Sequence, residues 1–272
     1  MTAIIKTEFQ KMRRYHIILI ALIGMFCSPL LQHFSQLVMD ESAKNPHYDL
    51  AALLENTVWG NAQIFLPVMI TLIGGYLINR EYTDDTLKNI LTVPVSFRKF
   101  LAAKLITAGI LAVGFGIYSF FAAIIVGFCA GLTEIRASVL GGYFLQMIIL
   151  SICIYIVVLP ILVIDSRKKG RFMGGSVAAF LLGYACLFFK TGILRSVYPV
   201  SAALTVAGFD MASYTGTNEP GNMLFAVLVL GSIVLATVIL VCCARAPGEE
   251  NISKKKNGRT DSDRRNFSER KR

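Results

Sequence analysis

The feature that most constrains this chain is a series of apolar runs, each long enough to cross a membrane and almost free of charge. A helix needs roughly 20 apolar residues to cross the hydrocarbon core of a bilayer. Only 16% of the 272 residues are charged, whereas a soluble domain of this length usually has about 25%. The chain is therefore predicted to be an all-α polytopic membrane protein with one folded membrane domain, residues 1–244.

Six apolar runs are interpreted as transmembrane helices, at residues 17–39, 58–78, 105–131, 139–164, 172–189 and 223–244. An interfacial helix over 3–16 precedes them, because Ile5 and Phe9 lie on one helical face and basic residues occupy much of the rest. A signal peptide is the alternative, but no small-residue cleavage site follows and the apolar character continues to Val38. Residues 245–272 alternate in charge and are poor in apolar residues, which predicts a basic, disordered tail.

The distribution of Lys and Arg predicts the orientation of the spans. Four lie before the first span, five in segment 79–104, four in segment 165–171 and ten in the tail. The connecting segments on the opposite side hold Lys44, Arg136, Lys190 and Arg195. Because positively charged segments stay in the cytoplasm, both termini are predicted to be cytoplasmic. The positive-inside distribution of Lys and Arg therefore accounts for the net charge of +10. No nucleic-acid partner is expected, since the sequence has no clusters of interleaved basic and aromatic residues.

A charged segment between the second and third spans has the features of a short cytoplasmic helix. Thr83 can cap its start, and two acidic residues follow in the first turn, where they suit the helix dipole. Lys88 lies four residues after Asp84, a favourable spacing for a helical ion pair. Pro94 disfavours helix at the residue before it, so the helix should be about two turns long. Its candidate residues are Glu81, Tyr82, Thr83, Asp84, Asp85, Thr86, Leu87, Lys88 and Asn89.

The chain contains no recognisable set of catalytic or metal-binding residues. The three histidines and six cysteines are not spaced as a metal site or a disulfide framework, and no phosphate-binding glycine motif occurs. No ionisable residue lies in the middle of a predicted span, which argues against an ion-coupled carrier. Asn61, Gln63 and Gln146 are the main polar side chains at depth, and they either line a pathway or form hydrogen bonds between helices.

Two segments on the predicted outer side also have functional interpretations. Residues 40–57 contain four acidic residues, either a surface for a cationic ligand or ordinary solvated charge. Residues 190–222 are partly apolar around Tyr198 and Pro199, and could dip back into the membrane as a re-entrant piece. Small-residue motifs in the third and fifth spans, including Gly127, favour close helix packing within one subunit or dimerisation.

The six spans, the basic N-terminal helix and the first cytoplasmic loop together resemble the ABC-2-type permeases. Within that family the chain is most similar to the bacitracin-resistance and lantibiotic-immunity branch. The loop has an acidic residue, Leu87-Lys88, Leu91-Thr92, Pro94, Ser96 and a basic residue before the third span. Asp85-Thr86 stands where the family commonly has Gly-Thr.

The resemblance implies a bacterial cell-membrane permease subunit with no catalytic activity of its own. Segment 81–92 would be the coupling helix that docks on a separate ATP-binding cassette ATPase, which would bind the ATP and magnesium. A second permease chain, identical or related, would complete the transporter, and its substrate would be an antimicrobial peptide expelled for self-protection or resistance. A membrane sensor that recruits a different partner and a stand-alone carrier are the alternatives.

Overall fold

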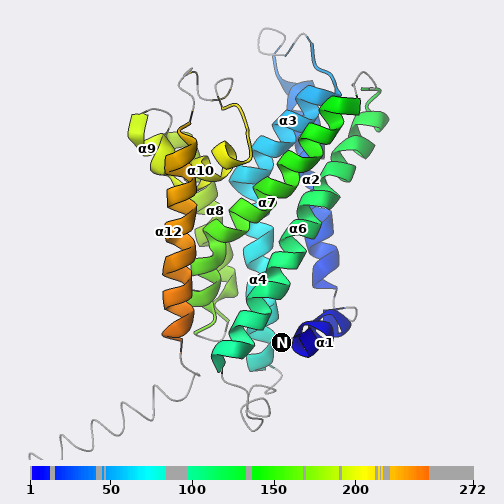
Figure 1. The fold of residues 1–272 in the computed structure, drawn as a ribbon. Helices are drawn as coiled ribbons and strands as arrows, with labels where there is room; N and C mark the ends of the chain where they lie inside the picture. Colours follow the sequence, from blue (N-terminus) through cyan, green and yellow to red (C-terminus); the bar gives the residue numbers. More distant parts are fainter. Residues whose placement is uncertain are drawn as a thin grey trace, which may run out of the picture.

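The computed structural model describes residues 2–12, 16–40, 45, 47–83, 97–132, 137–167, 170–189, 192–211, 214, 216 and 221–244. The described part of the chain is a bundle of long helices (Figure 1). The predicted all-α class is therefore confirmed.

The described residues form the following helices in chain order. They are α1 (Thr2–Met12), α2 (Ile17–Val38), α3 (Leu50–Gly60), the π-helical turn η1 (Asn61–Phe65), α4 (Leu66–Thr83), α6 (Phe97–Cys129), α7 (Ala137–Asp165), α8 (Phe172–Tyr184), the 3-10 turn η2 (Ala185–Phe188), α9 (Gly192–Val197), α10 (Pro199–Val206) and α12 (Met223–Cys242). Figure 1 shows α1 lying across the end of the bundle at which α12 finishes.

Five helical segments are long and apolar enough to cross a membrane: Ile17–Val38, Leu50–Glu81, Phe97–Cys129, Val139–Asp165 and Met223–Cys242. The remaining predicted span is the shorter apolar segment Phe172–Phe188. Its α-helical and 3-10 turns together rise roughly 27 Å, slightly less than the hydrocarbon core of about 30 Å. The described structure therefore supports five spans, and the sixth stays a prediction.

Two spans begin earlier than the apolar pattern predicts. The second was expected to start at Val58, but α3 begins at Leu50, where Asp49 caps the helix by accepting a hydrogen bond from the Ala52 amide at 2.8 Å. Residues 50–57 of the expected loop 40–57 are therefore helical, and so the interpretation of this part as a loop was wrong. The third was expected to start at residue 105, but α6 begins at Phe97.

The interfacial helix is present as α1, which ends at Met12 rather than at residue 16. Phe9 and Met12 pack against the hydrophobic core, as their position on the apolar face predicts. Glu8 is also buried, at 3% exposure, although a carboxylate on an interfacial helix was not expected to be. The tail over 245–272 and most of the predicted coupling segment, from Asp84 onward, lie outside the described residues.

α8 packs closely against the second span at the π-helical turn η1. Pro67 has no N–H, so it cannot donate to the carbonyl of Gln63 four residues earlier. Gly183 of α8 approaches this carbonyl so closely that an added Cβ would lie 2.0 Å from its oxygen. Ala179 is also fully buried. The small-residue motif of the fifth predicted span, formed by Gly175, Ala179 and Gly183, therefore packs within this chain.

Gly127 of α6 makes a similar contact, because a Cβ there would lie 2.3 Å from a methyl group of Leu50 on α3. Of the two roles predicted for the small-residue motifs, packing within one subunit is the one that the structure uses at this position.

Candidate functional site

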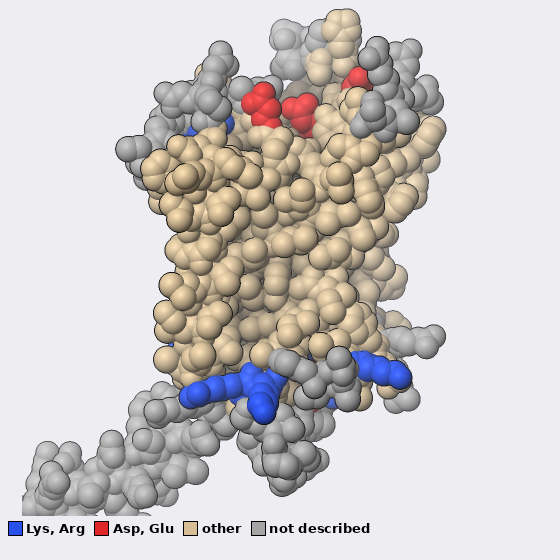
Figure 2. All heavy atoms as spheres, viewed as in Figure 1, with Lys and Arg blue, Asp and Glu red and all other residues tan. Residues whose placement is uncertain are grey.

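The two ends of the bundle differ in charge. On the face shown in Figure 2, most of the visible Lys and Arg residues gather at the end that carries α1, and the visible Asp and Glu residues lie at the opposite end. We call these the basic end and the acidic end. A cavity of about 670 Å³ opens at the acidic end between α3, the first turns of α7 and the segment after α10.

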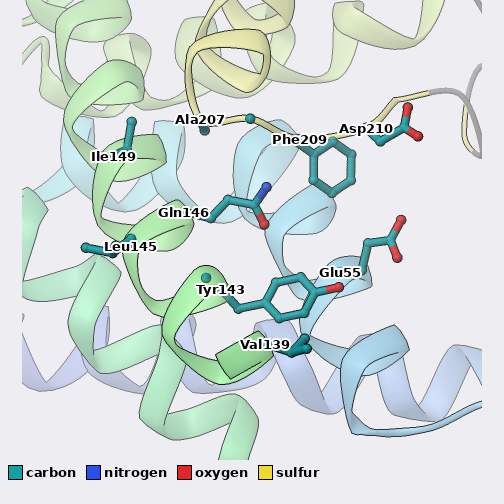
Figure 3. Close-up of a pocket in the computed structure, with 11 residues that line it drawn as sticks. Glu55, Val139, Tyr143, Leu145, Gln146, Ile149, Ala207, Phe209 and Asp210 are labelled. Atoms are coloured by element: carbon teal, nitrogen blue, oxygen red, sulfur yellow. The ribbon is translucent and has the colours of Figure 1, made fainter. Parts of the chain in front are cut away.

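Three polar side chains on two helices line this cavity. Glu55 comes from α3, and Tyr143 and Gln146 come from α7. Figure 3 shows the Tyr143 hydroxyl directed toward the Glu55 carboxylate, with the Gln146 amide pointing toward the ring of Phe209. Asp210 adds a second carboxylate to the lining. The cavity therefore combines acidic, hydrogen-bonding and apolar groups, a lining that suits an amphipathic cation.

Glu55 also lines a second cavity of about 470 Å³, between α2 and α3. Tyr214 stands in the wall of this cavity and donates a hydrogen bond to the Asn56 side-chain oxygen at 2.6 Å. Burial, followed by the negative charge of Glu55, raises the pKa of the Tyr214 phenol above its ordinary value of 10.0. Tyr214 therefore keeps its proton at physiological pH and remains a donor.

An aromatic cluster holds the segment after α10 against α3. The ring of Trp59 stacks on Tyr214 at 4.8 Å and on Phe209 at 5.8 Å between centroids. These contacts fix one wall of the larger cavity relative to the helix that supplies Glu55.

The three polar residues predicted at depth do not form one site. Gln146 lines the larger cavity, but Asn61 and Gln63 are buried in η1. Asn61 donates a hydrogen bond to the Ser119 hydroxyl at 2.6 Å, the interhelical role that was the alternative to a pathway. The side-chain nitrogen of Gln63 is buried and has no hydrogen-bond partner among the described residues.

Tyr198 and Pro199 stand at the start of α10, with Pro199 at its first position. The Tyr198 ring stacks on Phe189 at 4.5 Å between centroids, and its hydroxyl donates to the Leu182 carbonyl. Residues Val200–Leu204 of α10 are almost fully buried. The segment is thus packed helix, and its predicted re-entry into the membrane stays a prediction.

A second polar group lies at the basic end. Lys104 of α6 is 2% exposed and donates to Glu8 of α1 at 2.5 Å and to Glu81 of α4 at 2.9 Å. Lys11 of α1 lies 3.0 Å from the same Glu81 oxygen. Of the predicted coupling residues, Glu81, Tyr82 and Thr83 are the described ones, and they form the end of α4.

Sequence reasoning assigned Glu81 to the coupling helix and missed both Glu8 and the ion cluster. It included Glu55 only as one of the four acidic residues of segment 40–57, a candidate surface for a cationic ligand. One signal was available for Lys104, which is a single charge within the apolar sequence Leu101-Ala102-Ala103-Lys104-Leu105-Ile106. A lone charge in such a run is costly to bury unless it is paired.

A bundle of long apolar helices with a basic and an acidic end defines a multi-pass membrane protein, and comparisons with known proteins identify its class. The family model described as "ABC-2 family transporter protein" matches residues 4–186. The chain belongs to this family, and so it is a membrane permease subunit of an ABC transporter. The matched region includes Glu55, Gln146 and Lys104.

One curated relative is named bacitracin transport permease protein BCRB, from Bacillus licheniformis. The chain is 30% identical to it over 150 residues, which is 54% of this chain and 72% of the relative. This similarity supports a place near the bacitracin branch of the family.

Proposed function

We propose that the protein is the permease of an exporter that removes a cationic, amphipathic antimicrobial peptide, of the bacitracin or lantibiotic type, from the bacterial cell membrane. The observation that carries the proposal is membership of the ABC-2 family, together with a relative whose name specifies bacitracin transport. The protein itself would be a transport subunit and not an enzyme.

The cavity at the acidic end supports a cationic substrate. If both termini are cytoplasmic, as the distribution of Lys and Arg predicts, this cavity faces outward. A peptide leaving the outer leaflet could place an ammonium group near Glu55 and apolar groups near Phe209, both of which line the cavity.

The energy would come from a separate ATPase, which would hold the ATP and magnesium and dock on segment 81–92. Asp84, Asp85 and Lys88 would set the register of this contact, because interfacial charges contribute more to specificity than to affinity. A second permease chain, identical or related, would complete the membrane part, and rigid-body rocking would expose the pathway alternately.

Killing curves test the proposal. Cells would carry this gene, the gene for its candidate ATPase, both, or neither, and would be exposed to bacitracin and a panel of lantibiotics. The proposal predicts that resistance to at least one peptide rises only when both genes are present. Unchanged killing by every peptide in the panel would contradict the substrate class, and resistance from this gene alone would favour the stand-alone carrier or the sensor.

Glu55→Gln tests the contribution of the cavity. Losing one partly exposed charge pair of about 1 kcal/mol should weaken protection by about fivefold. Asp40→Asn is the matched control, because Asp40 is exposed at the same end of the bundle and is not part of the lining. Equal effects of the two substitutions would show that general surface charge, and not the cavity, attracts the peptide.

A further inference from the structure

The ion cluster at the basic end, defined as Glu8, Lys11, Glu81 and Lys104, joins three helices. Glu8 and Lys11 belong to α1, Glu81 to α4 and Lys104 to α6. The Lys104 ammonium donates to Glu8 at 2.5 Å, to Glu81 at 2.9 Å and to the Leu77 carbonyl at 3.0 Å. An ammonium has three N–H groups, so every donor of this buried group has an acceptor.

The cluster is closed to water on one side and partly open on the other. Glu8, Glu81 and Lys104 are each at most 4% exposed, whereas the Lys11 side chain is 43% exposed and lies at the rim. Two carboxylates and two ammonium groups balance in charge. Next to Lys104, the Phe100 ring lies 5.4 Å from the ammonium nitrogen.

The position of the cluster in the chain distinguishes it from an ordinary buried ion pair. Glu81 stands in the last turn of α4, and Lys104 stands two turns into α6. The segment proposed to dock on the ATPase begins at Glu81, and Lys104 stands in α6, the helix that follows this segment. The same ammonium also binds Glu8, on the helix that lies across the basic end of the bundle.

Stability alone does not account for such a cluster. Apolar side chains of similar volume are often as stabilising as a buried ion pair, because the pair loses its hydration. What charged groups add is a defined geometry, since three hydrogen bonds from one ammonium fix the positions of their acceptors. The cluster therefore favours one arrangement of α1, α4 and α6.

We propose that Lys104 is a positioning residue that locks α1 to α4 and α6 at the basic end of the bundle. A force applied to the segment between α4 and α6 then moves all three helices as one unit. The inference rests on the proposed ATP-driven function for its role in transport. The lock itself is a property of this chain alone, and so it can be tested separately.

The first test measures the lock in the purified permease. Spin labels are placed at Gln10 of α1 and Arg98 of α6, both exposed, after replacement of the six free cysteines. Double electron–electron resonance should give a narrow distance distribution with the cluster intact, and the same distance when the ATPase binds nucleotide. A distance that changes with nucleotide, or a broad distribution in the intact protein, would overturn the proposal.

The second test removes the ion pair between Lys104 of α6 and Glu8 of α1 without leaving an unbalanced charge. Glu8→Gln combined with Lys104→Met deletes one carboxylate and one ammonium, and leaves Lys11 paired with Glu81 at 3.0 Å. The double variant should broaden the spin-label distribution. It should still co-purify with the ATPase and hydrolyse ATP, while substrate transported per ATP falls about tenfold, within the usual range of coupling energies.

Lys99→Met is the matched control, because Lys99 is an exposed lysine of α6 and should leave transport per ATP unchanged. A double variant with unchanged coupling would overturn the proposal. Absence of ATP-driven transport in the unmodified protein would contradict the proposed function instead. If the double variant does not fold, the measurements on the intact cluster still decide whether α1 and α6 move together.

Discussion

Removing the Lys104 ammonium alone should destabilise the protein more than removing it together with a carboxylate. Lys104→Met leaves Glu8 and Glu81 buried, each at most 4% exposed, and deletes three hydrogen bonds. Breaking a buried ion pair costs about 3–5 kcal/mol. We expect about 3 kcal/mol, the lower end of the range given for such pairs, because Lys11 still lies 3.0 Å from Glu81.

The double variant Glu8→Gln/Lys104→Met should recover most of this loss, since one carboxylate is neutralised and the other keeps Lys11. The assay is the fraction of detergent-solubilised protein that stays monodisperse after heating, measured for the unmodified protein, the single variant and the double variant. The expected order of thermal stability is unmodified, then double, then single. A double variant as unstable as the single variant would refute the reasoning, because the cost would then not arise from uncompensated buried charge.

Three further substitutions test the packing around the site. Gly183→Val should destabilise the bundle by about 1–3 kcal/mol through overpacking, because a Cβ would lie 2.0 Å from a backbone oxygen of η1. Gly174→Val should not, because no atom of the described residues lies within 4 Å of the position of its Cβ. Heat-induced aggregation would separate the two variants. Ser119→Ala should cost about 1 kcal/mol by removing the interhelical acceptor of Asn61, and a neutral effect in the same assay would argue against that bond. Tyr214→Phe should cost about 1 kcal/mol by removing its hydrogen bond to α3, while tryptophan fluorescence should stay nearly unchanged, because phenylalanine keeps the ring that stacks on the single tryptophan.

The membrane helices were predictable where the apolar pattern is continuous. The fourth predicted span, 139–164, lies within α7, Ala137–Asp165, because no charge interrupts its apolar run. The predicted starts at 58 and 105 were too late because a charge precedes each of them, Glu55 in one case and Lys104 in the other. Local hydropathy penalises such residues, although both stand inside helices.

The residues that surround the Lys104 and Glu55 side chains lie far away in the sequence. Lys104 binds Glu8, which is 96 residues earlier, and no local periodicity contains that contact. The cavity at the acidic end has the same character, because it brings Glu55 together with Gln146 and Phe209 from distant segments. The family resemblance, in contrast, depended on local residues and could be recognised from the sequence.

The most direct test of the central claim is ATP-driven peptide transport in proteoliposomes that contain the permease and its candidate ATPase. The account predicts transport when both proteins are present, and its loss, together with loss of ATPase co-purification, when Asp84, Asp85 and Lys88 are all replaced by Ala. Energised transport by the permease alone, or an ATPase that stays bound after deletion of residues 81–92, would contradict it.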